Sequence, residues 1–170
     1  MKGYVHVYTG NGKGKTTAAF GLAVRALCSG KTVYIGQFIK GMKYHEVQIE
    51  EKFEGIKIEQ YGENCFIEKA PEAEDFERAK IGLEKISEIL KSGEYDLVIL
   101  DEVSIAMHFK MIDEEALIEV INNRAEHVEV VVTGRYAPEK LIDLADLVTE
   151  MKEIKHYYEQ GVLSRPGIDH

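Results

Sequence analysis

The chain has 170 residues, of which 45% are hydrophobic, and this suits one compact domain with a sizeable core rather than two domains or a disordered chain. Its formal net charge of −9 disfavours a sequence-independent nucleic-acid surface, so we expect no nucleic-acid partner. No apolar run reaches the roughly 18 residues that span a bilayer, and the amino terminus lacks the apolar core of a secretion signal, so we expect a cytoplasmic protein with no membrane partner.

A buried strand is predicted over residues 3–9, and an alanine-rich helix from Thr17 to Cys28 follows it. Between them lies what we call the phosphate loop, the run Gly10-Asn11-Gly12-Lys13-Gly14-Lys15-Thr16-Thr17. Its glycines let successive backbone N–H groups face one concavity, and the helix behind adds the positive end of its dipole. Lys15 adds a full charge, and Thr16 offers a hydroxyl to a phosphate-bound Mg²⁺. The run therefore predicts a nucleotide phosphate site.

The spacing of the phosphate loop departs by one residue from the usual pattern GxxxxGK[ST]. That pattern requires glycine at position 9, where this chain has Thr9 and places Gly10 one position later. The alternative interpretation is a glycine-rich turn that merely caps a helix. The Gly-Lys-Thr-Thr sequence directly after a strand favours phosphate binding over that alternative.

A second strand is predicted over residues 32–38, a short third strand over 56–61, and a loop over 62–71. The long helix predicted over residues 71–92 has apolar side chains spaced three and four apart, so one stripe should face the sheet. The residues of this stripe are Phe76, Ala79, Leu83, Ile86 and Leu90. Acidic residues in the first turn of the helix complement its dipole.

Four apolar residues followed by Asp101 and Glu102 are typical of a central parallel strand that is buried on both faces. Beside a phosphate loop, such carboxylates predict a strand that holds magnesium and positions water. The alternative is a buried strand that happens to end in acidic turn residues. The phosphate loop upstream favours the first interpretation.

The last third of the chain predicts a helix over residues 113–122 and a strand over 128–133 that delivers Gly134 and Arg135 at its carboxyl end. Open α/β sheets bind ligands at that end, so Arg135 could stabilise charge on a leaving phosphate chain; its alternative role is a surface salt bridge. A short helix after residue 138, a strand over 147–151 and a polar tail that folds over an edge complete the chain.

Strands that alternate with helices, with no repeat and no low-complexity linker, predict a mostly parallel sheet of about six strands with helices on both faces. With the phosphate loop after the first strand, the expected architecture is α/β with a P-loop NTPase, RecA-like core. We expect residues 1–170 to form a single nucleotide-binding domain.

The chain resembles the ATP:corrinoid adenosyltransferases, the P-loop type of cob(I)alamin adenosyltransferase. The resemblance begins in the phosphate loop and its continuation Thr17-Ala18-Ala19-Phe20-Gly21 and then spans almost the whole chain in order. Several linked motifs are far more specific than the phosphate loop alone. These further motifs are Gln37-Phe38-Ile39-Lys40-Gly41, Leu100-Asp101-Glu102, Thr133-Gly134-Arg135, Ala145-Asp146-Leu147-Val148-Thr149-Glu150-Met151, Lys155-His156 and Gly167-Ile168-Asp169.

The chain also departs from the family pattern. The loop after the third strand often carries Phe-x-Trp in that family, whereas this chain has Phe66-Ile67-Glu68 and no tryptophan. Members commonly have an amino-terminal extension that helps to close the corrinoid site, and this chain starts almost at the first strand. Ala125 replaces a proline, which we interpret as a structural difference only.

The resemblance implies that Co(I) of a reduced corrinoid attacks C5′ of ATP, forms an adenosyl–cobalt bond and releases triphosphate. The enzyme must then stabilise charge on the whole departing triphosphate. The resemblance assigns this role to the phosphate loop, with Lys15 and Arg135 as catalytic cations. The displaced glycine fits a loop that holds triphosphate in another orientation than a kinase does.

The same resemblance assigns Thr16 and Glu102 to Mg²⁺ and Asp101 to its second shell. Phe66 would press on the lower face of the corrinoid, although without the family it would be interpreted as a packing residue. The residues expected to line the corrinoid side of the site are Phe66, Gln37, Lys40 and His156. The expected partners are ATP, the corrinoid and an electron-donating flavoprotein reductase, and a homodimer is allowed.

Two other functions remain open from the sequence: another P-loop kinase or NTPase for small molecules, and a module that binds nucleotide or corrinoid without turnover. The other histidines form no metal-like pair: His6 lies in a predicted strand, His45 and His108 in predicted loops, and His127 before a strand. Cys28 and Cys65 are the only cysteines, and their spacing predicts neither a disulfide framework nor a zinc site.

Overall fold

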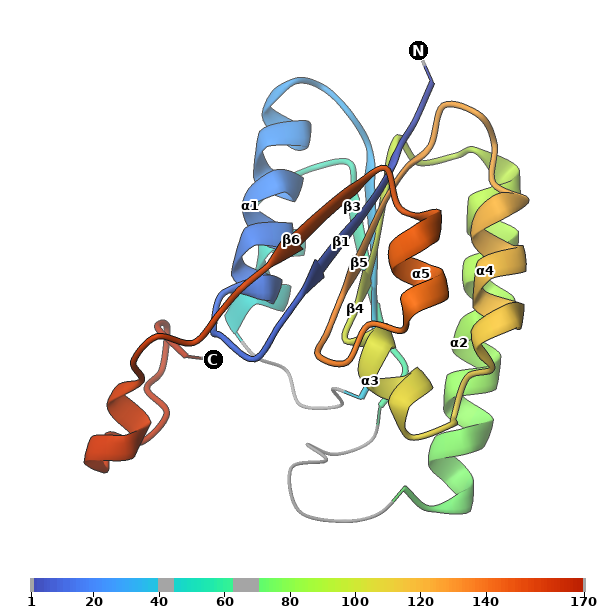
Figure 1. The fold of residues 1–170 in the computed structure, drawn as a ribbon. Helices are drawn as coiled ribbons and strands as arrows, with labels where there is room; N and C mark the ends of the chain where they lie inside the picture. The colour runs from blue at the N-terminus through green and yellow to red at the C-terminus, as the bar shows by residue number, and fades with distance from the viewer. Residues whose placement is uncertain (1, 40–44, 63–70, 170) are drawn as a thin grey trace.

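A computed structural model describes residues 2–39, 45–62 and 71–169 of the chain and shows a six-stranded sheet (Figure 1). The strand order is β3-β2-β4-β5-β1-β6, and every neighbouring pair is parallel. The strands are β1 Val5–Thr9, β2 Val33–Gln37, β3 Ile56–Gln60, β4 Leu97–Asp101, β5 Glu129–Thr133 and β6 Leu147–Glu150. The predicted α/β class and all six predicted strands are confirmed.

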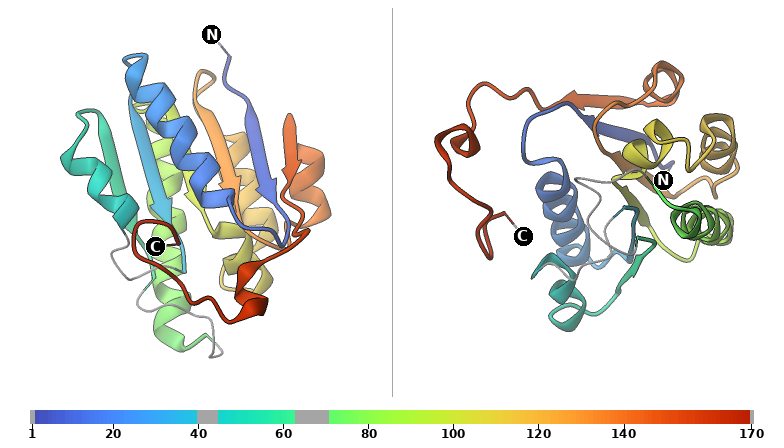
Figure 2. Two further views of the ribbon diagram at one scale, coloured as in Figure 1. Left: turned by 90° about the vertical axis from the view of Figure 1, so that its left-hand side faces the viewer. Right: turned by 90° about the horizontal axis from the view of Figure 1, so that it is seen from below.

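Helices cover both faces of the sheet, as predicted (Figures 1 and 2). The helices are α1 Lys15–Cys28, α2 Ala73–Ser92, α3 Val103–His108, α4 Glu114–Asn122, α5 Glu139–Leu144 and the 3₁₀ helices η1 His45–Glu51 and η2 Tyr157–Gln160. Right-handed crossovers put connections that move toward β3 on one face and connections that move toward β6 on the other. Accordingly α1 and η1 cover one face, and α2, α3, α4 and α5 cover the other.

Two hydrophobic clusters, one on each face of the sheet, form the core. β2 and β4 are buried at every residue because both of their faces are covered. This is why β4 has a continuous apolar sequence rather than an alternating one. The covered central strands give the residues at their carboxyl ends a rigid base.

The stripe predicted on α2 is correct for its middle and end and wrong at its start. Phe76 is 41% exposed, whereas Gly82 and Ile89 are buried. A Cβ at Gly82 would lie 2.7 Å from the ring of Tyr61, so the helix meets the sheet through a glycine that the apolar pattern passed over. The ring of Tyr61 also lies 5.3 Å from that of Phe38, centroid to centroid.

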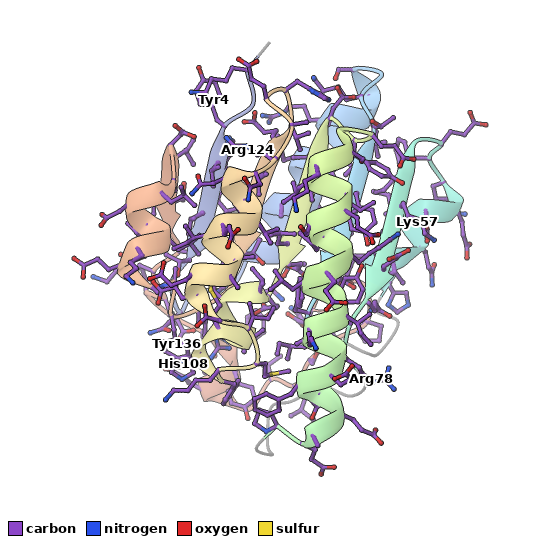
Figure 3. The ribbon with its side chains drawn as sticks, turned by 90° about the vertical axis from the view of Figure 1, so that its right-hand side faces the viewer. Tyr4, Lys57, Arg78, His108, Arg124 and Tyr136 are labelled. Atoms are coloured by element: carbon purple, nitrogen blue, oxygen red, sulfur yellow. The ribbon has the colours of Figure 1, made fainter. Side chains whose placement is uncertain are left out.

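The short helices α3, η1 and η2 were not predicted, because segments of four to seven residues show little periodicity. His108, expected in a loop, is the last residue of α3, and His45 is the first residue of η1. The ring of His108 stacks on that of Tyr136 at a centroid distance of 4.3 Å, and Figure 3 shows the two side chains together. Within the described ranges, none of the helices is both long and apolar enough to cross a bilayer.

Candidate nucleotide-binding site

The candidate site lies where the carboxyl ends of the central parallel strands meet. The phosphate loop follows β1, Gln37 ends β2, Asp101 ends β4 and Thr133 ends β5. Parallel strands deliver these four segments to one edge of the sheet, where open α/β sheets bind ligands. The residues are far apart in sequence, and the strand order brings them together.

The phosphate loop is fastened to the residues that follow β6. The N–H of Gly12 donates to the carbonyl of Met151 at 2.7 Å, and the N–H of Met151 donates to the carbonyl of Thr9 at 2.8 Å. A Cβ on Gly10 would lie 2.5 Å from the Met151 carbonyl oxygen, and a Cβ on Gly12 would lie 2.7 Å from it. Both glycines therefore allow the loop to approach another backbone closely.

This contact gives a structural reason for Thr9, where the usual loop pattern has glycine. Thr9 is the last residue of β1 and pairs with Glu150 of β6, so the strand continues through position 9. The chain turns at Gly10, whose φ of 98° lies in the region that favours glycine. Position 9 therefore belongs to the strand, and the first glycine of the loop stands at position 10, where the chain turns.

Lys15 is buried inside the phosphate loop, with 7% of its surface exposed. Its Nζ donates to the carbonyls of Gly10 and Gly12, at 2.7 Å each. Burial lowers the pKa of Lys15, and the nearby charge of Arg135 lowers it further, while Glu102 opposes the shift. Glu102 and Arg135 are thus the charged residues with the largest effects on the pKa of Lys15.

Asp101 is fully buried and lies at the centre of the site. Its Oδ1 accepts hydrogen bonds from the hydroxyls of Thr16 at 2.8 Å and Thr133 at 2.7 Å, and its Oδ2 accepts from Nε2 of Gln37 at 3.1 Å. Gln37 is itself fixed, because its Oε1 accepts from Nε2 of Gln60 at 2.9 Å. One carboxylate therefore links β2, β4 and β5 to the first turn of α1.

The hydroxyl of Thr133 joins β5 to the start of α3. It donates to Asp101 and accepts from the N–H of Glu102 at 3.0 Å. Glu102 has a φ of 60°, a conformation that non-glycine residues adopt rarely and that often marks functional sites. Thr133 was not predicted as a site residue. Its signal was a hydroxyl at the carboxyl end of a strand, next to the glycine and arginine that were singled out.

Oxygen atoms dominate this part of the site. The Thr16 hydroxyl gives its one hydrogen to Asp101, and its oxygen is a hydrogen-bond acceptor and a possible metal ligand. The described ranges contain no cluster of three or more His, Cys, Asp or Glu side chains suited to a metal. Mg²⁺ commonly binds through one or two protein oxygens, and phosphate oxygens and water complete its octahedron, so Thr16 and Glu102 form a fitting donor set.

Other predicted site residues have different surroundings. Lys40 and Phe66 lie outside the described residues, as does Cys65. Asn11, Thr17 and Arg135 are exposed. His156 caps η2 by accepting from the N–H of Tyr158 at 3.0 Å. Lys13 is turned toward the carboxyl terminus, where it pairs with Asp169, a residue that was quoted in a motif but given no role.

The comparisons with known proteins agree over the whole chain. The family model for ATP:corrinoid adenosyltransferase BtuR/CobO/CobP matches residues 1–170. A corrinoid adenosyltransferase from a Sinorhizobium species is 38% identical over 172 residues, which cover 99% of this chain and 80% of that protein. Corrinoid adenosyltransferase CobA of Salmonella typhimurium is 34% identical over 169 residues, covering 99% and 86%. A corrinoid adenosyltransferase of Escherichia coli strain K12 is 33% identical over 178 residues, covering 99% and 86%. The resemblance seen in the motifs is thus confirmed, and the chain belongs to the ATP:corrinoid adenosyltransferase family.

Proposed function

We propose that this chain transfers the 5′-deoxyadenosyl group of ATP to Co(I) of a reduced corrinoid and releases triphosphate, and that the site described above performs the transfer. The bond between the Thr16 hydroxyl and the buried Asp101 carboxylate, next to Lys15, is the observation that carries the assignment of the site. It joins the phosphate loop to the strand end where a nucleotide-bound magnesium is expected.

The difficulty of the reaction lies in the leaving group. Attack at C5′ breaks the bond to the triphosphate oxygen, so negative charge grows on the triphosphate as it leaves. The N–H groups of Asn11, Lys13 and Gly14 and the ammonium of Lys15 stabilise that charge, whereas the N–H of Gly12 is bonded to Met151. We assign a second positive charge to Arg135, which follows β5 at the same edge of the sheet.

Lys15 is held by carbonyls of its own loop and has a lowered pKa. A triphosphate offers it full negative charges in place of two neutral carbonyl oxygens, and charge-assisted hydrogen bonds are the stronger ones. We therefore assign the Lys15 ammonium to the triphosphate, to which its bonds move from Gly10 and Gly12. The exchange stabilises the protonated form of Lys15.

When bound, Mg²⁺ would neutralise part of the triphosphate charge. Thr16 and Glu102 would hold the ion through oxygen atoms. Asp101 orients the Thr16 hydroxyl by accepting its hydrogen, and Gln37 and Thr133 in turn fix the carboxylate. This supports an indirect role for Asp101, which acts through Thr16.

The corrinoid side of the site rests on the family resemblance. We keep Phe66 as the residue that presses on the lower face of the corrinoid, and an electron-donating flavoprotein reductase as the partner. Phe66→Ala should reduce activity more when Co(II) must be reduced on the enzyme than when Co(I) is supplied. Equal effects in both assays would remove its role.

The deciding experiment incubates the protein with ATP, Mg²⁺ and chemically reduced cobalamin. We expect the adenosyl–cobalt spectrum to appear together with one triphosphate per product. Production of ADP instead would identify a kinase or NTPase, and tight binding with no product would identify a binding module. Lys15→Ala should lower the rate by about 100-fold or more, since it removes a charged donor from the leaving group. Lys91→Ala, an exposed lysine at the end of α2, is the matched control.

A further inference from the structure

The residues after β6 contact the phosphate loop at two places. Met151 bonds to Gly12 directly after the strand, and the segment then turns through η2 and returns so that Asp169 meets Lys13. We call residues 151–169 the C-terminal segment. In both views of Figure 2 it arches away from the sheet and comes back on the side of α1.

Asp169, near the end of the C-terminal segment, accepts several of the hydrogen bonds that hold this end in place. Its Oδ1 accepts from Nζ of Lys13 and from the hydroxyl of Tyr157, and its Oδ2 accepts from the N–H of Arg165 at 3.0 Å and from Nε of Arg165 at 3.1 Å. Lys13 also donates to the carbonyl of Ile168 at 3.1 Å. The Arg165 guanidinium lies over the ring of Tyr157, 4.8 Å from its centroid.

These contacts satisfy both oxygens of a side chain that is only 10% exposed, although it lies in an exposed segment. The hydrogen bond from Lys13, together with those from Tyr157 and Arg165, holds the pKa of Asp169 well below its ordinary value. The carboxylate is therefore charged at neutral pH and interacts with the positive charges of both Lys13 and Arg165.

The C-terminal segment makes few buried contacts with the other described residues. No residue between 152 and 169 is buried, and Ile154 and Leu163 are 84% and 74% exposed. Segments with few buried apolar contacts have low local stability, so their position depends on the polar contacts that they make. Near the end of the C-terminal segment, Asp169 makes those polar contacts.

We propose that Asp169 is a positioning residue of the nucleotide site, which acts through Lys13 to hold the phosphate loop in the conformation that binds triphosphate. Gly12 is fixed through its N–H by Met151, and the next residue, Lys13, is fixed through its side chain by Asp169. The N–H of Lys13 lies between the two attachments and that of Gly14 follows them, and both are assigned to the triphosphate. The inference rests on the proposed function of the loop and adds the C-terminal segment to it.

The direction of the effect follows from this arrangement. Asp169→Asn keeps the size of the side chain but removes the charge and one acceptor, so Lys13 and Arg165 are no longer both satisfied. The loop then has to be ordered when ATP binds, which weakens binding. Because the pair involving Lys13 is partly exposed, we expect a three- to ten-fold rise in the Kd for ATP. Once ATP is bound the loop is ordered, so kcat at saturating ATP should change little.

The test measures the Kd for ATP with Mg²⁺ by isothermal titration calorimetry, using the full chain without corrinoid. Four variants are compared with the parent: Asp169→Asn, Lys13→Met, the double variant and Asp169→Glu. If Asp169 acts through Lys13, Asp169→Asn should have almost no further effect once Lys13→Met is present. Asp169→Glu should restore most of the affinity. Glu159→Gln removes the same charge from η2 and should leave the Kd unchanged.

Hydrogen exchange of residues 11–14 provides a second readout. It should accelerate in Asp169→Asn and not in Glu159→Gln. Additive effects in the double variant, or a Kd and exchange equal to those of the parent, would overturn the positioning role while leaving adenosyl transfer intact. If the parent protein binds no ATP, the assignment of the phosphate loop and this inference both fail. If the parent binds ATP but forms no adenosyl–cobalt bond, only the proposed function fails.

Discussion

Replacing Gly12 by alanine tests whether the phosphate loop depends on its contact with Met151. Gly12 is not among the glycines with positive φ, so we attribute the effect of alanine to its Cβ contacts rather than to its φ. The new Cβ would lie 2.7 Å from the carbonyl oxygen of Met151 and 2.9 Å from the carbonyl carbon of Lys152. Both are backbone atoms, so no rotamer change relieves the overlap.

Overpacking of this kind typically costs about 1–3 kcal/mol, and loss of the bond from the Gly12 N–H to Met151 adds about 1 kcal/mol. The exposed loop can relieve the strain by moving away from residues 151–153. If about 2 kcal/mol of this strain opposes ATP binding, the Kd for ATP rises roughly 30-fold. The free energy of unfolding should fall by less than the full strain, because the displaced loop leaves the core intact.

Gly21→Ala is the matched control, since its Cβ would meet no atom within 4 Å and the residue lies inside α1. It should raise the free energy of unfolding by about 0.5–1 kcal/mol and leave ATP binding unchanged. Calorimetric titration with ATP and urea unfolding measure the two quantities for both variants. If Gly12→Ala binds ATP within three-fold of the parent at unchanged stability, the close approach to Met151 does not shape the site.

Three further outcomes are expected. Burial lowers the pKa of Lys15, and bound triphosphate favours its protonated form, so the complex binds more protons than the free protein. ATP affinity should therefore fall as pH rises, and the fall should start below the ordinary lysine pKa of about 10.4. An affinity that stays constant up to that pH contradicts this. Asp101→Asn removes one acceptor oxygen, so one hydrogen-bond donor that faces it loses its acceptor and the Thr16 hydroxyl is no longer oriented. The Mg²⁺ concentration required in activity titrations should rise about 10- to 100-fold. An unchanged requirement would exclude the orienting role. Gly82→Ala should lower the free energy of unfolding by about 1–2 kcal/mol in urea melts, since overlap with Tyr61 at 2.7 Å exceeds the gain in helix propensity; a stabilised variant would show that the ring can move.

The fold could largely be predicted from local patterns. Continuous apolar runs predicted β4 and β5, because a strand that is buried on both faces is apolar at every position. Apolar residues spaced three and four apart predicted α2, because a helix that is buried on one face is apolar only along that face. The pattern was wrong at Phe76, since an apolar residue in the first turn of a helix need not reach the sheet. The pattern also missed Gly82, because glycine has no apolar side chain and so does not contribute to a hydrophobic stripe, even where an aromatic ring packs against it.

The candidate site was predictable only in part, and the reason is the order of the strands. The phosphate loop and Asp101 are visible locally, because each is a short motif at the end of an apolar run. Gln37 lies opposite Asp101 in the register of β2 with β4, and Leu100 lies opposite Val132 in that of β4 with β5, which brings Thr133 beside Asp101. Given those registers, the two partners of the carboxylate that lie on neighbouring strands, Gln37 and Thr133, follow directly.

Nothing in the sequence alone states that β5 lies between β4 and β1, or that β6 lies beyond β1. The first of these facts places Thr133 between Asp101 and the phosphate loop, and the second places Met151 against Gly12. In the motif at residues 133–135, the sequence alone therefore favours the charged arginine as the site residue, whereas the threonine makes the buried contact with Asp101. In a parallel sheet, short polar side chains at the carboxyl ends of apolar strands should be examined together with the charged residues that follow them.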